Sequence, residues 1–150
     1  MAIMADWAIR QASMSDVEAV AELRATVLRT DLERLGGYDA HRVRQRLRDG
    51  FDPAHTWVIE VGGVFAGCVA LRPADHCHWL EYFYLTPALQ GSGIGSSVLR
   101  ELLDRCDRSG ALVRLNLLQG SPARRLYERH GFTVEIEDPV DVFMVRRLPQ

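Results

Sequence analysis

A glycine-rich segment in the middle of the chain limits what this sequence can fold into more than any other feature. Residues 90–97 read Gln-Gly-Ser-Gly-Ile-Gly-Ser-Ser, between an apolar, aromatic stretch and a segment of helical periodicity. Glycine lets the backbone adopt positive φ and approach a ligand closely. The start of a helix adds unpaired N–H groups and a partial positive charge. A strand, a glycine loop and a helix in this order therefore predict a crossover with a phosphate site at its turn.

Two common phosphate-binding loops do not fit this segment. A Walker loop needs a lysine and then a serine or threonine after its last glycine, whereas Gly95 is followed by Ser96 and Ser97. The dinucleotide fingerprint needs glycine or alanine three residues beyond its second glycine, and that position is also Ser96. Taken alone, the loop is a weak signal, and a tight turn that binds nothing is an alternative.

The rest of the chain alternates between strand and helix patterns. Apolar, β-branched runs predict strands over residues 7–12, 56–61, 64–71, 79–85, 112–118, 132–136 and 140–145. Helical periodicity predicts helices that begin at Ser13 or Ser15, at Asp39, behind the glycine loop and at Pro122. Gly62-Gly63 between two strand runs indicates a hairpin. The order predicts one α/β domain over residues 1–150, with a mixed, mostly antiparallel twisted sheet flanked by about four helices.

Charge and cysteine content narrow the class of protein. The chain has 18 Lys and Arg against 20 Asp and Glu, a formal net charge of −2, which argues against a general nucleic-acid binder. Its three cysteines are scattered, with neither a disulfide framework nor a zinc-knuckle spacing. No stretch is apolar enough to span a membrane, and residues 1–10 lack a signal-peptide pattern. We expect a reduced, cytoplasmic protein that binds neither nucleic acid nor a membrane.

The context of the glycine loop resembles the GCN5-related N-acetyltransferase (GNAT) family. Residues 80–95, Leu-Glu-Tyr-Phe-Tyr-Leu-Thr-Pro-Ala-Leu-Gln-Gly-Ser-Gly-Ile-Gly, are similar to the family's coenzyme A motif: a strand, a proline turn, then Gln/Arg-x-x-Gly-x-Gly/Ala. Gln90, Gly93 and Gly95 match that pattern. Residues 121–132, Ser-Pro-Ala-Arg-Arg-Leu-Tyr-Glu-Arg-His-Gly-Phe, resemble the family's second motif, a helix ending in Leu-Tyr-Glu-x-x-Gly-Phe. Two motifs in the right order are more specific than either alone, and the resemblance covers nearly the whole chain.

The resemblance implies how acetyl-coenzyme A would bind as a cosubstrate. Backbone groups of residues 83–85 would pair with the pantetheine arm like an added strand, and N–H groups of the loop would hold the pyrophosphate. Many family members carry an asparagine where this chain has Ser121 or Gly120, and of these two only Ser121 offers a side-chain hydrogen bond. The expected cofactor-binding residues are Phe83, Tyr84, Leu85, Gln90, Gly91, Ser92, Gly93, Ile94, Gly95, Ser96 and Ser121.

Acetyl transfer to an amine requires two proton transfers. Tyr127 falls where the family's general acid lies. A phenol with a pKa of about 10 is a weaker acid than a thiol with a pKa of about 8.5, so protonating the leaving thiolate is only mildly uphill. Glu81 is the candidate base, because strict alternation would put it on an apolar strand face with Phe83 and Leu85, where desolvation raises a carboxyl pKa. Tyr127 could instead be a core residue, and Glu81 could form an ion pair with Arg72. A backbone N–H of the strand, we expect that of Leu85, would stabilise the oxyanion.

The family's acceptor pocket is usually built from the first two helices and the loop between them. Asp31 and Tyr38, with Glu33 and Trp57, are therefore the candidate substrate-binding residues. Acidic groups there would suit a cationic amine, and surface charge at helix ends accounts for them equally well. His76-Cys77-His78 lacks a third ligand at a metal-binding spacing, so no metal site is expected, and His78 is a second candidate base.

The sequence thus predicts an enzyme that moves an acetyl group from acetyl-coenzyme A to a primary amine of a small molecule or peptide. A coenzyme A-binding module that senses without turnover is the alternative. The loop supports both equally, whereas Glu81 and Tyr127 favour the enzyme. Succinyl- or propionyl-coenzyme A fits the loop as well as the acetyl thioester. A homodimer is a further expectation from the family.

Overall fold

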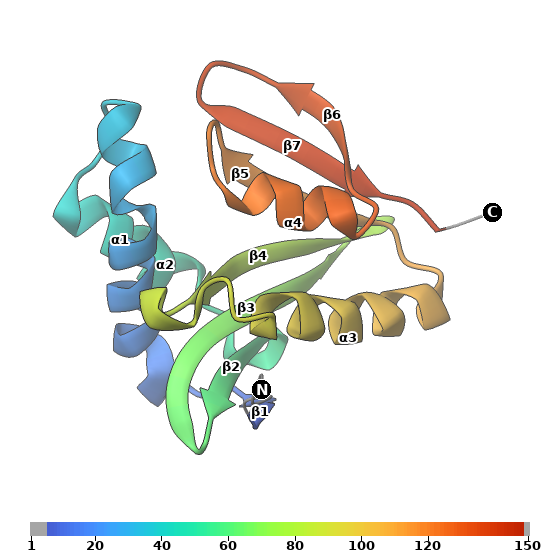
Figure 1. The fold of residues 1–150 in the computed structure, drawn as a ribbon, viewed down its shortest axis with the longest axis horizontal. Helices are drawn as coiled ribbons and strands as arrows, with labels where there is room; N and C mark the ends of the chain where they lie inside the picture. The colour runs from blue at the N-terminus through green and yellow to red at the C-terminus, as the bar shows by residue number, and fades with distance from the viewer. Residues whose placement is uncertain (1–5, 149–150) are drawn as a thin grey trace.

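The computed structural model describes residues 6–148, which form a seven-stranded sheet with helices on both faces (Figure 1). The strands are β1 (Trp7–Gln11), β2 (Thr56–Val61), β3 (Val64–Ala74), β4 (Cys77–Leu85), β5 (Val113–Leu118), β6 (Thr133–Glu137) and β7 (Asp141–Arg146). The helices are α1 (Val17–Arg34), α2 (Ala40–Gly50), α3 (Ile94–Ser109) and α4 (Ala123–Arg129). The predicted fold class and order of elements are confirmed.

The sheet is antiparallel except at its centre. Its strand order is β1-β2-β3-β4-β5-β7-β6, and β4 and β5 are the parallel pair, joined by the crossover through α3. The predicted hairpin between β2 and β3 is also present. Gly62 and Gly63 have φ of 59° and 80°, a backbone that a two-residue turn needs and that glycine adopts without strain.

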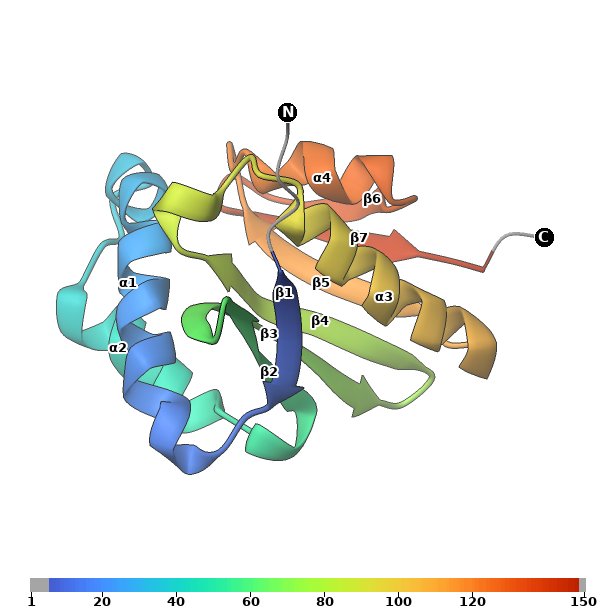
Figure 2. The same cartoon turned by 60° about the horizontal axis from the view of Figure 1, so that its bottom comes forward.

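Helices cover both faces of the sheet (Figure 2), and an apolar layer of side chains lies on each face. α1 and α2 pack on one face through residues such as Val20, Leu23 and Leu47, which contact Val58 and Cys68 of the strands. α3 and α4 pack on the other through Val98, Leu102 and Tyr127 with strand residues of β2–β5 and β7. The chain therefore presents different helices to the two faces of one sheet, and the ends of β4 and β5 lie between them.

The hairpin of β3 and β4 is longer than the sequence pattern predicted. β3 continues to Ala74 and β4 already begins at Cys77, whereas the pattern placed these limits at Leu71 and Trp79. Ala74 pairs with Cys77, so Asp75 and His76 form the turn, with His76 at a φ of 66°. A pattern read from apolar residues misses such an extension because exposed polar residues can pair their backbones as well as apolar ones.

β4 and β5 part from each other halfway along. Their parallel pairing covers His78–Leu80 opposite Val113–Leu115 and ends there. Beyond this point β4 stays paired with β3 as far as Leu85, and β5 stays paired with β7 as far as Leu118. The facing edges of these two strand ends therefore carry backbone N–H and C=O groups that form no hydrogen bonds between β4 and β5. The free edge of β4 lies directly before the glycine loop.

Candidate active site

The glycine loop lies at the start of α3 and offers four free backbone donors. Gly91 and Gly93 have φ of 77° and 90°, and Gly93 is the N-cap of the helix without any side-chain cap. Within residues 6–148, the N–H groups of Gly91, Gly93, Gly95 and Ser96 have no acceptor. α3 is 16 residues long, so its dipole adds to their positive potential. The loop can hold a phosphate group.

Gly95 brings the loop against β4 and α4. A Cβ atom on Gly95 would lie 3.3 Å from Leu85 Cδ1 and 3.9 Å from both Phe83 Cζ and Leu126 Cδ2. The first contact is tighter than side chains usually allow, so glycine is favoured here by close packing. The end of β4, the loop and the middle of α4 are thus neighbours.

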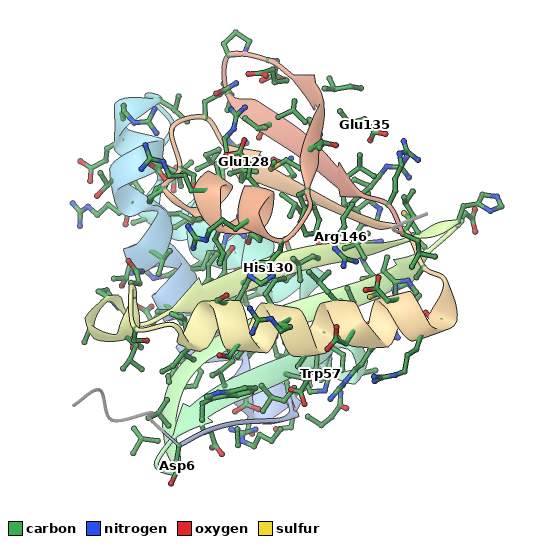
Figure 3. All side chains as sticks on the ribbon, turned by 45° about the vertical axis from the view of Figure 1, so that its right-hand side comes forward. Asp6, Trp57, Glu128, His130, Glu135 and Arg146 are labelled. Carbon is green, nitrogen blue, oxygen red and sulfur yellow. The ribbon has the colours of Figure 1, made fainter. Side chains whose placement is uncertain are left out.

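A polar groove continues from the loop along α3. Its volume is about 530 Å³, and it lies between α3, the end of α4 and β7. Ser96 Oγ lies 2.9 Å from His130 Nε2, and Arg146 Nε donates to the His130 carbonyl at 2.8 Å. Figure 3 shows His130 and Arg146 on the same side of α3. The remaining lining residues are Arg100, Leu103, Asp104 and Arg129. Burial and then the positive charges of Arg100, Arg129 and Arg146 lower the pKa of His130.

The groove has an excess of positive charge. Arg146 is neutralised by Asp107, with bonds of 2.7 and 3.0 Å, whereas Arg100 and Arg129 form no ion pair within the described part of the chain. The sequence analysis did not identify Arg100, Arg129 or Arg146 as candidate site residues. Ser96 and Arg100 are four residues apart on one helix face, a spacing that could have pointed to a basic residue beside the phosphate loop.

A bulge at Tyr82 changes which way the residues of β4 face. The register passes from Ala70 opposite Glu81 to Cys68 opposite Tyr84, so that Tyr82 and Phe83 face a single residue of β3. Tyr82 has a φ of 51°, a left-handed conformation that is uncommon for a side chain of this size. The predicted common face of Glu81, Phe83 and Leu85 is therefore wrong, because strict alternation does not survive a bulge.

Glu81 faces the side of the sheet that carries α1 and α2. Its neighbour Leu80 packs in the opposite layer with α3, as do Phe83 and Leu85 beyond the bulge. Glu81 Oε1 accepts a hydrogen bond from Arg72 Nε at 2.6 Å, so the ion pair considered as an alternative is present. Oε2 accepts no hydrogen bond within residues 6–148, and the side chain is 27% exposed.

Tyr127 lies in the layer of α3 and α4. Its ring packs edge-on against Phe132, with centroids 5.6 Å apart and planes at 67°. The residue is buried, and this burial raises the pKa of the phenol above its usual value. The hydroxyl has no hydrogen-bond partner among the described residues. It therefore stays protonated at neutral pH and remains available to a ligand.

Two expected cofactor residues have part of their polar surface in use. Gln90 Nε2 donates to the Leu85 carbonyl at 3.2 Å. Ser121 Oγ accepts from the Ala123 N–H at 3.2 Å at the start of α4 and keeps its own proton to donate. The Tyr84 side chain packs with α1 and α2 instead, and its hydroxyl accepts from Arg24 at 2.9 Å, so that Tyr84 offers the cofactor side its backbone alone.

The expected acceptor residues are not all brought together. Asp31 pairs with Arg34 at 2.9 Å, and Arg34 also donates to the Gln119 carbonyl, which ties the end of α1 to the turn before α4. The Arg29 guanidinium lies 5.0 Å from the centre of the Tyr38 ring. Glu33, the remaining acidic candidate of this loop, pairs with Arg29 at 2.6 Å. The carboxylates are thus already paired with arginines, which weakens the argument for a cationic acceptor.

Trp57 lies on the other face of the sheet. It packs in the layer of α3, and the Arg105 guanidinium lies 5.7 Å from its ring centre. Figure 3 shows it below α3, on the side opposite His130 and Arg146. Because side chains alternate along β2, Val58 faces α1 and α2 and Trp57 cannot. Trp57 therefore does not line an acceptor site formed by α1 and α2.

Neither a metal site nor a membrane helix is found in the described part of the chain. Within residues 6–148, no three His, Cys, Asp or Glu side chains cluster closely enough to hold a metal ion. Over the same residues, no helix combines the length and apolarity needed to cross a bilayer. His78, the second candidate base, pairs in the parallel segment of β4, and its Nδ1 is buried without a partner among these residues.

The fold and the site define a class of acyl-coenzyme A-dependent transferases, and comparison with known families agrees. The model of the Acetyltransferase (GNAT) family matches residues 18–132, so this chain belongs to the GNAT family of acetyltransferases. No curated protein sequence matches it significantly.

Solved structures show the same fold at low sequence identity. The PaiA N-acetyltransferase from Thermoplasma acidophilum, in complex with coenzyme A, is 20% identical, with a TM-score of 0.76 over 95% of this chain and 99% of that one. The ribosomal-protein-S18-alanine N-acetyltransferase from Escherichia coli is 14% identical, with a TM-score of 0.74 over 97% and 96%. N-acetylglutamate synthase from Neisseria gonorrhoeae, with coenzyme A and N-acetyl-glutamate, is 21% identical, with a TM-score of 0.69 over 99% and 36%.

Proposed function

We propose that this protein transfers an acetyl group from acetyl-coenzyme A to a primary amine of a small molecule or peptide by direct attack. The observation that carries the proposal is that a free anion-binding site lies next to a free strand edge. Four unpaired N–H groups begin α3, and the unpaired edge of β4 leads directly into them. A phosphate and an extended amide-containing arm are both parts of coenzyme A, and this arrangement suits the two together.

The backbone of β4 supports a bound pantetheine arm. The Tyr82 carbonyl points toward β3, where Cys68 donates to it, and a trans peptide directs the following N–H the opposite way. By alternation, the N–H and C=O groups of Phe83 and Leu85 both face the edge that β5 leaves free. The nucleotide phosphates would then lie at the glycine loop and in the groove with Arg100 and Arg129.

Phe83, rather than Leu85, is our proposed oxyanion donor. The reacting carbonyl must lie within reach of the base and of a donor at once. The Phe83 N–H is two residues from Glu81, whereas the Leu85 N–H is four residues away and next to the Gln90 contact. A preorganised N–H at this point would stabilise the charge that develops when the amine attacks the thioester.

The proposed acid and base face opposite sides of the sheet. Glu81 faces α1 and α2, where the amine would enter, and its free Oε2 can accept the amine proton directly or through a water molecule. Tyr127 lies with α3 and α4 on the cofactor side and would protonate the leaving thiolate. An ordinary glutamate and an alkylammonium differ by about 6 pKa units, or about 8 kcal/mol, so we expect the amine to react in its neutral form.

The test is thiol release from acetyl-coenzyme A against amino acids, polyamines, aminoglycosides and short peptides. We expect release with one acceptor class, and roughly 10² less of it in Glu81→Gln. Glu60→Gln is the matched control, since Glu60 is also a strand glutamate paired with an arginine and is 29% exposed. A wild-type pH–rate profile in Glu81→Gln would remove Glu81 from this role. Tight binding without release would favour the sensor, and absence of binding would contradict the proposal.

A further inference from the structure

Cys68 makes an unusual contact in the interior of the sheet. Its side chain is fully buried in β3, and its thiol donates a hydrogen bond to the Tyr82 carbonyl at 3.2 Å. Tyr82 is the bulged residue of β4, with a φ of 51°. The contact therefore joins a side chain of one strand to the peptide unit at which the neighbouring strand departs from regular pairing.

This peptide unit needs external support. A left-handed tyrosine is strained and persists only where the surrounding structure imposes it. The Tyr82 side chain is held by the Arg24 guanidinium, 5.6 Å from the ring centre, and by α2, where Gly50 leaves no room for a Cβ beside the hydroxyl. These contacts hold the ring. Among the described residues, Cys68 is the side chain that bonds to the carbonyl and so fixes the rotation of the peptide.

We propose that Cys68 is a positioning residue for acetyl transfer, which turns the Tyr82–Phe83 peptide so that the Phe83 N–H points into the thioester site. The carbonyl and the N–H of one trans peptide point in opposite directions, so a donor on the carbonyl side orients the N–H. This inference rests on the proposed function. In this role the Cys68 thiol does not touch the substrate, but it aligns the Phe83 N–H, which does.

The protonation state of Cys68 suits this role. Burial raises the pKa of its thiol to about 12, so it remains a donor at all pH values at which the enzyme would work. The same burial makes it a poor nucleophile, because the thiolate is the reactive form. A role as acyl carrier would need that thiolate, whereas a role as donor needs the thiol.

The chain offers a matched control for removing this thiol. Cys106 on α3 is buried as well, 2% exposed against 0% for Cys68, and its thiol forms no hydrogen bond within residues 6–148. Cys68→Ala and Cys106→Ala remove the same atom from two apolar layers and should cost similar stability. We expect Cys68→Ala alone to lower kcat, about tenfold, a part of the roughly 10² to 10³ lost when an oxyanion donor is deleted.

Cys68→Ser decides whether hydrogen bonding or packing is responsible. Serine keeps a donor at this position, so we expect it to restore most of kcat, while the KM for acetyl-coenzyme A changes little in all three variants. Equal kcat in Cys68→Ala and Cys106→Ala would overturn the proposal. A serine variant as slow as the alanine variant would also overturn it, because the thiol would then act by its volume.

A second readout separates this inference from the proposed function. The amide resonance of Phe83 in the free protein reports the direction and exposure of its N–H without any turnover. We expect it to shift, and its hydrogen exchange to change, in Cys68→Ala and not in Cys106→Ala. If the wild-type protein acetylates no amine, the proposed function fails. The Phe83 amide resonance still tests whether Cys68 sets the direction of the Phe83 N–H. An unchanged Phe83 amide would refute the positioning role even in an active enzyme.

Discussion

The hydroxyl of Ser96 and the imidazole of His130 meet at 2.9 Å, joining the first turn of α3 to the end of α4. The two residues are 34 positions apart; Ser96 directly follows the first sequence motif, and His130 belongs to the second. The phosphate loop and the helix of the candidate acid are therefore connected by a side-chain contact as well as by apolar packing.

This contact predicts a pH dependence of coenzyme A binding. His130 is surrounded by arginines and partly buried, which lowers its pKa from 6.5. A bound phosphate would offset the repulsion from the arginines and raise that pKa, so binding would take up a proton and tighten as pH falls from the pKa of the complex toward the lower pKa of the free protein. The measurement is calorimetric affinity at several pH values, with the His130 ring followed by NMR.

The free protein should show the opposite trend in stability. Because the folded state holds His130 more strongly in its neutral form, the unfolded chain binds more protons below about pH 6.5, and stability is lost there as pH falls. His130→Gln should remove both effects. An affinity independent of pH in wild type would exclude a phosphate beside this ring.

Tyr127→Phe should abolish most turnover without unfolding the protein. The edge-on packing against Phe132 needs the ring and not the hydroxyl, which has no partner within the described residues. We expect kcat to fall by roughly 10² to 10³ with little change in Tm. Steady-state kinetics and a thermal melt check this together. Undiminished turnover would leave Tyr127 a core residue.

The glycines at the two ends of α3 provide a matched pair. Gly93 and Gly110 have φ of 90° and 74°, and a Cβ at either would find open space or ordinary contact. Alanine at each should cost about 1–2 kcal/mol from backbone strain. Only Gly93→Ala should raise the KM for acetyl-coenzyme A, because only Gly93 belongs to the phosphate loop. Equal KM values in the two variants would contradict the loop assignment.

Asp16 should govern acid stability far from the site. It accepts two hydrogen bonds of 2.9 Å from Arg10 and one of 2.8 Å from the Ser13 N–H, and the Arg10 contact lowers its pKa to about 2. Its stabilisation is therefore complete above about pH 5 and is lost as pH falls through about 2. Asp16→Asn should cost about 1–2 kcal/mol at pH 7 and only a small part of that at pH 2, by urea unfolding. Glu60→Gln, at the same arginine, should cost less.

The fold could be predicted from the sequence because its signals are local. Gly62-Gly63 fixes a hairpin, and Asp39 caps α2 by accepting hydrogen bonds from the N–H groups of residues 41 and 42. The bulge at Tyr82 could not be predicted, because tyrosine does not favour positive φ and the cause lies in contacts with Cys68 and α1. That one residue reversed the face expected for Glu81.

The candidate site could be proposed from the sequence where it depends on the backbone, whereas its parts that depend on tertiary contacts could not. The glycine loop follows from residue types that any ligand-binding turn needs. The groove of Arg100, Arg129 and His130 combines two helices that meet only in the folded protein. Trp57 was misplaced relative to Asp31 and Tyr38 because the sequence does not reveal which helices cover which face of a strand.

The separation of β4 from β5 has a consequence for kinetic order. If the thioester lies at the free edge of β4, the donor enters beside α3 and α4 while the amine enters beside α1 and α2. Neither reactant then has to leave before the other arrives, and no acylated protein is needed between them. Double-reciprocal plots should intersect rather than run parallel, and free coenzyme A should compete with acetyl-coenzyme A but not with the amine.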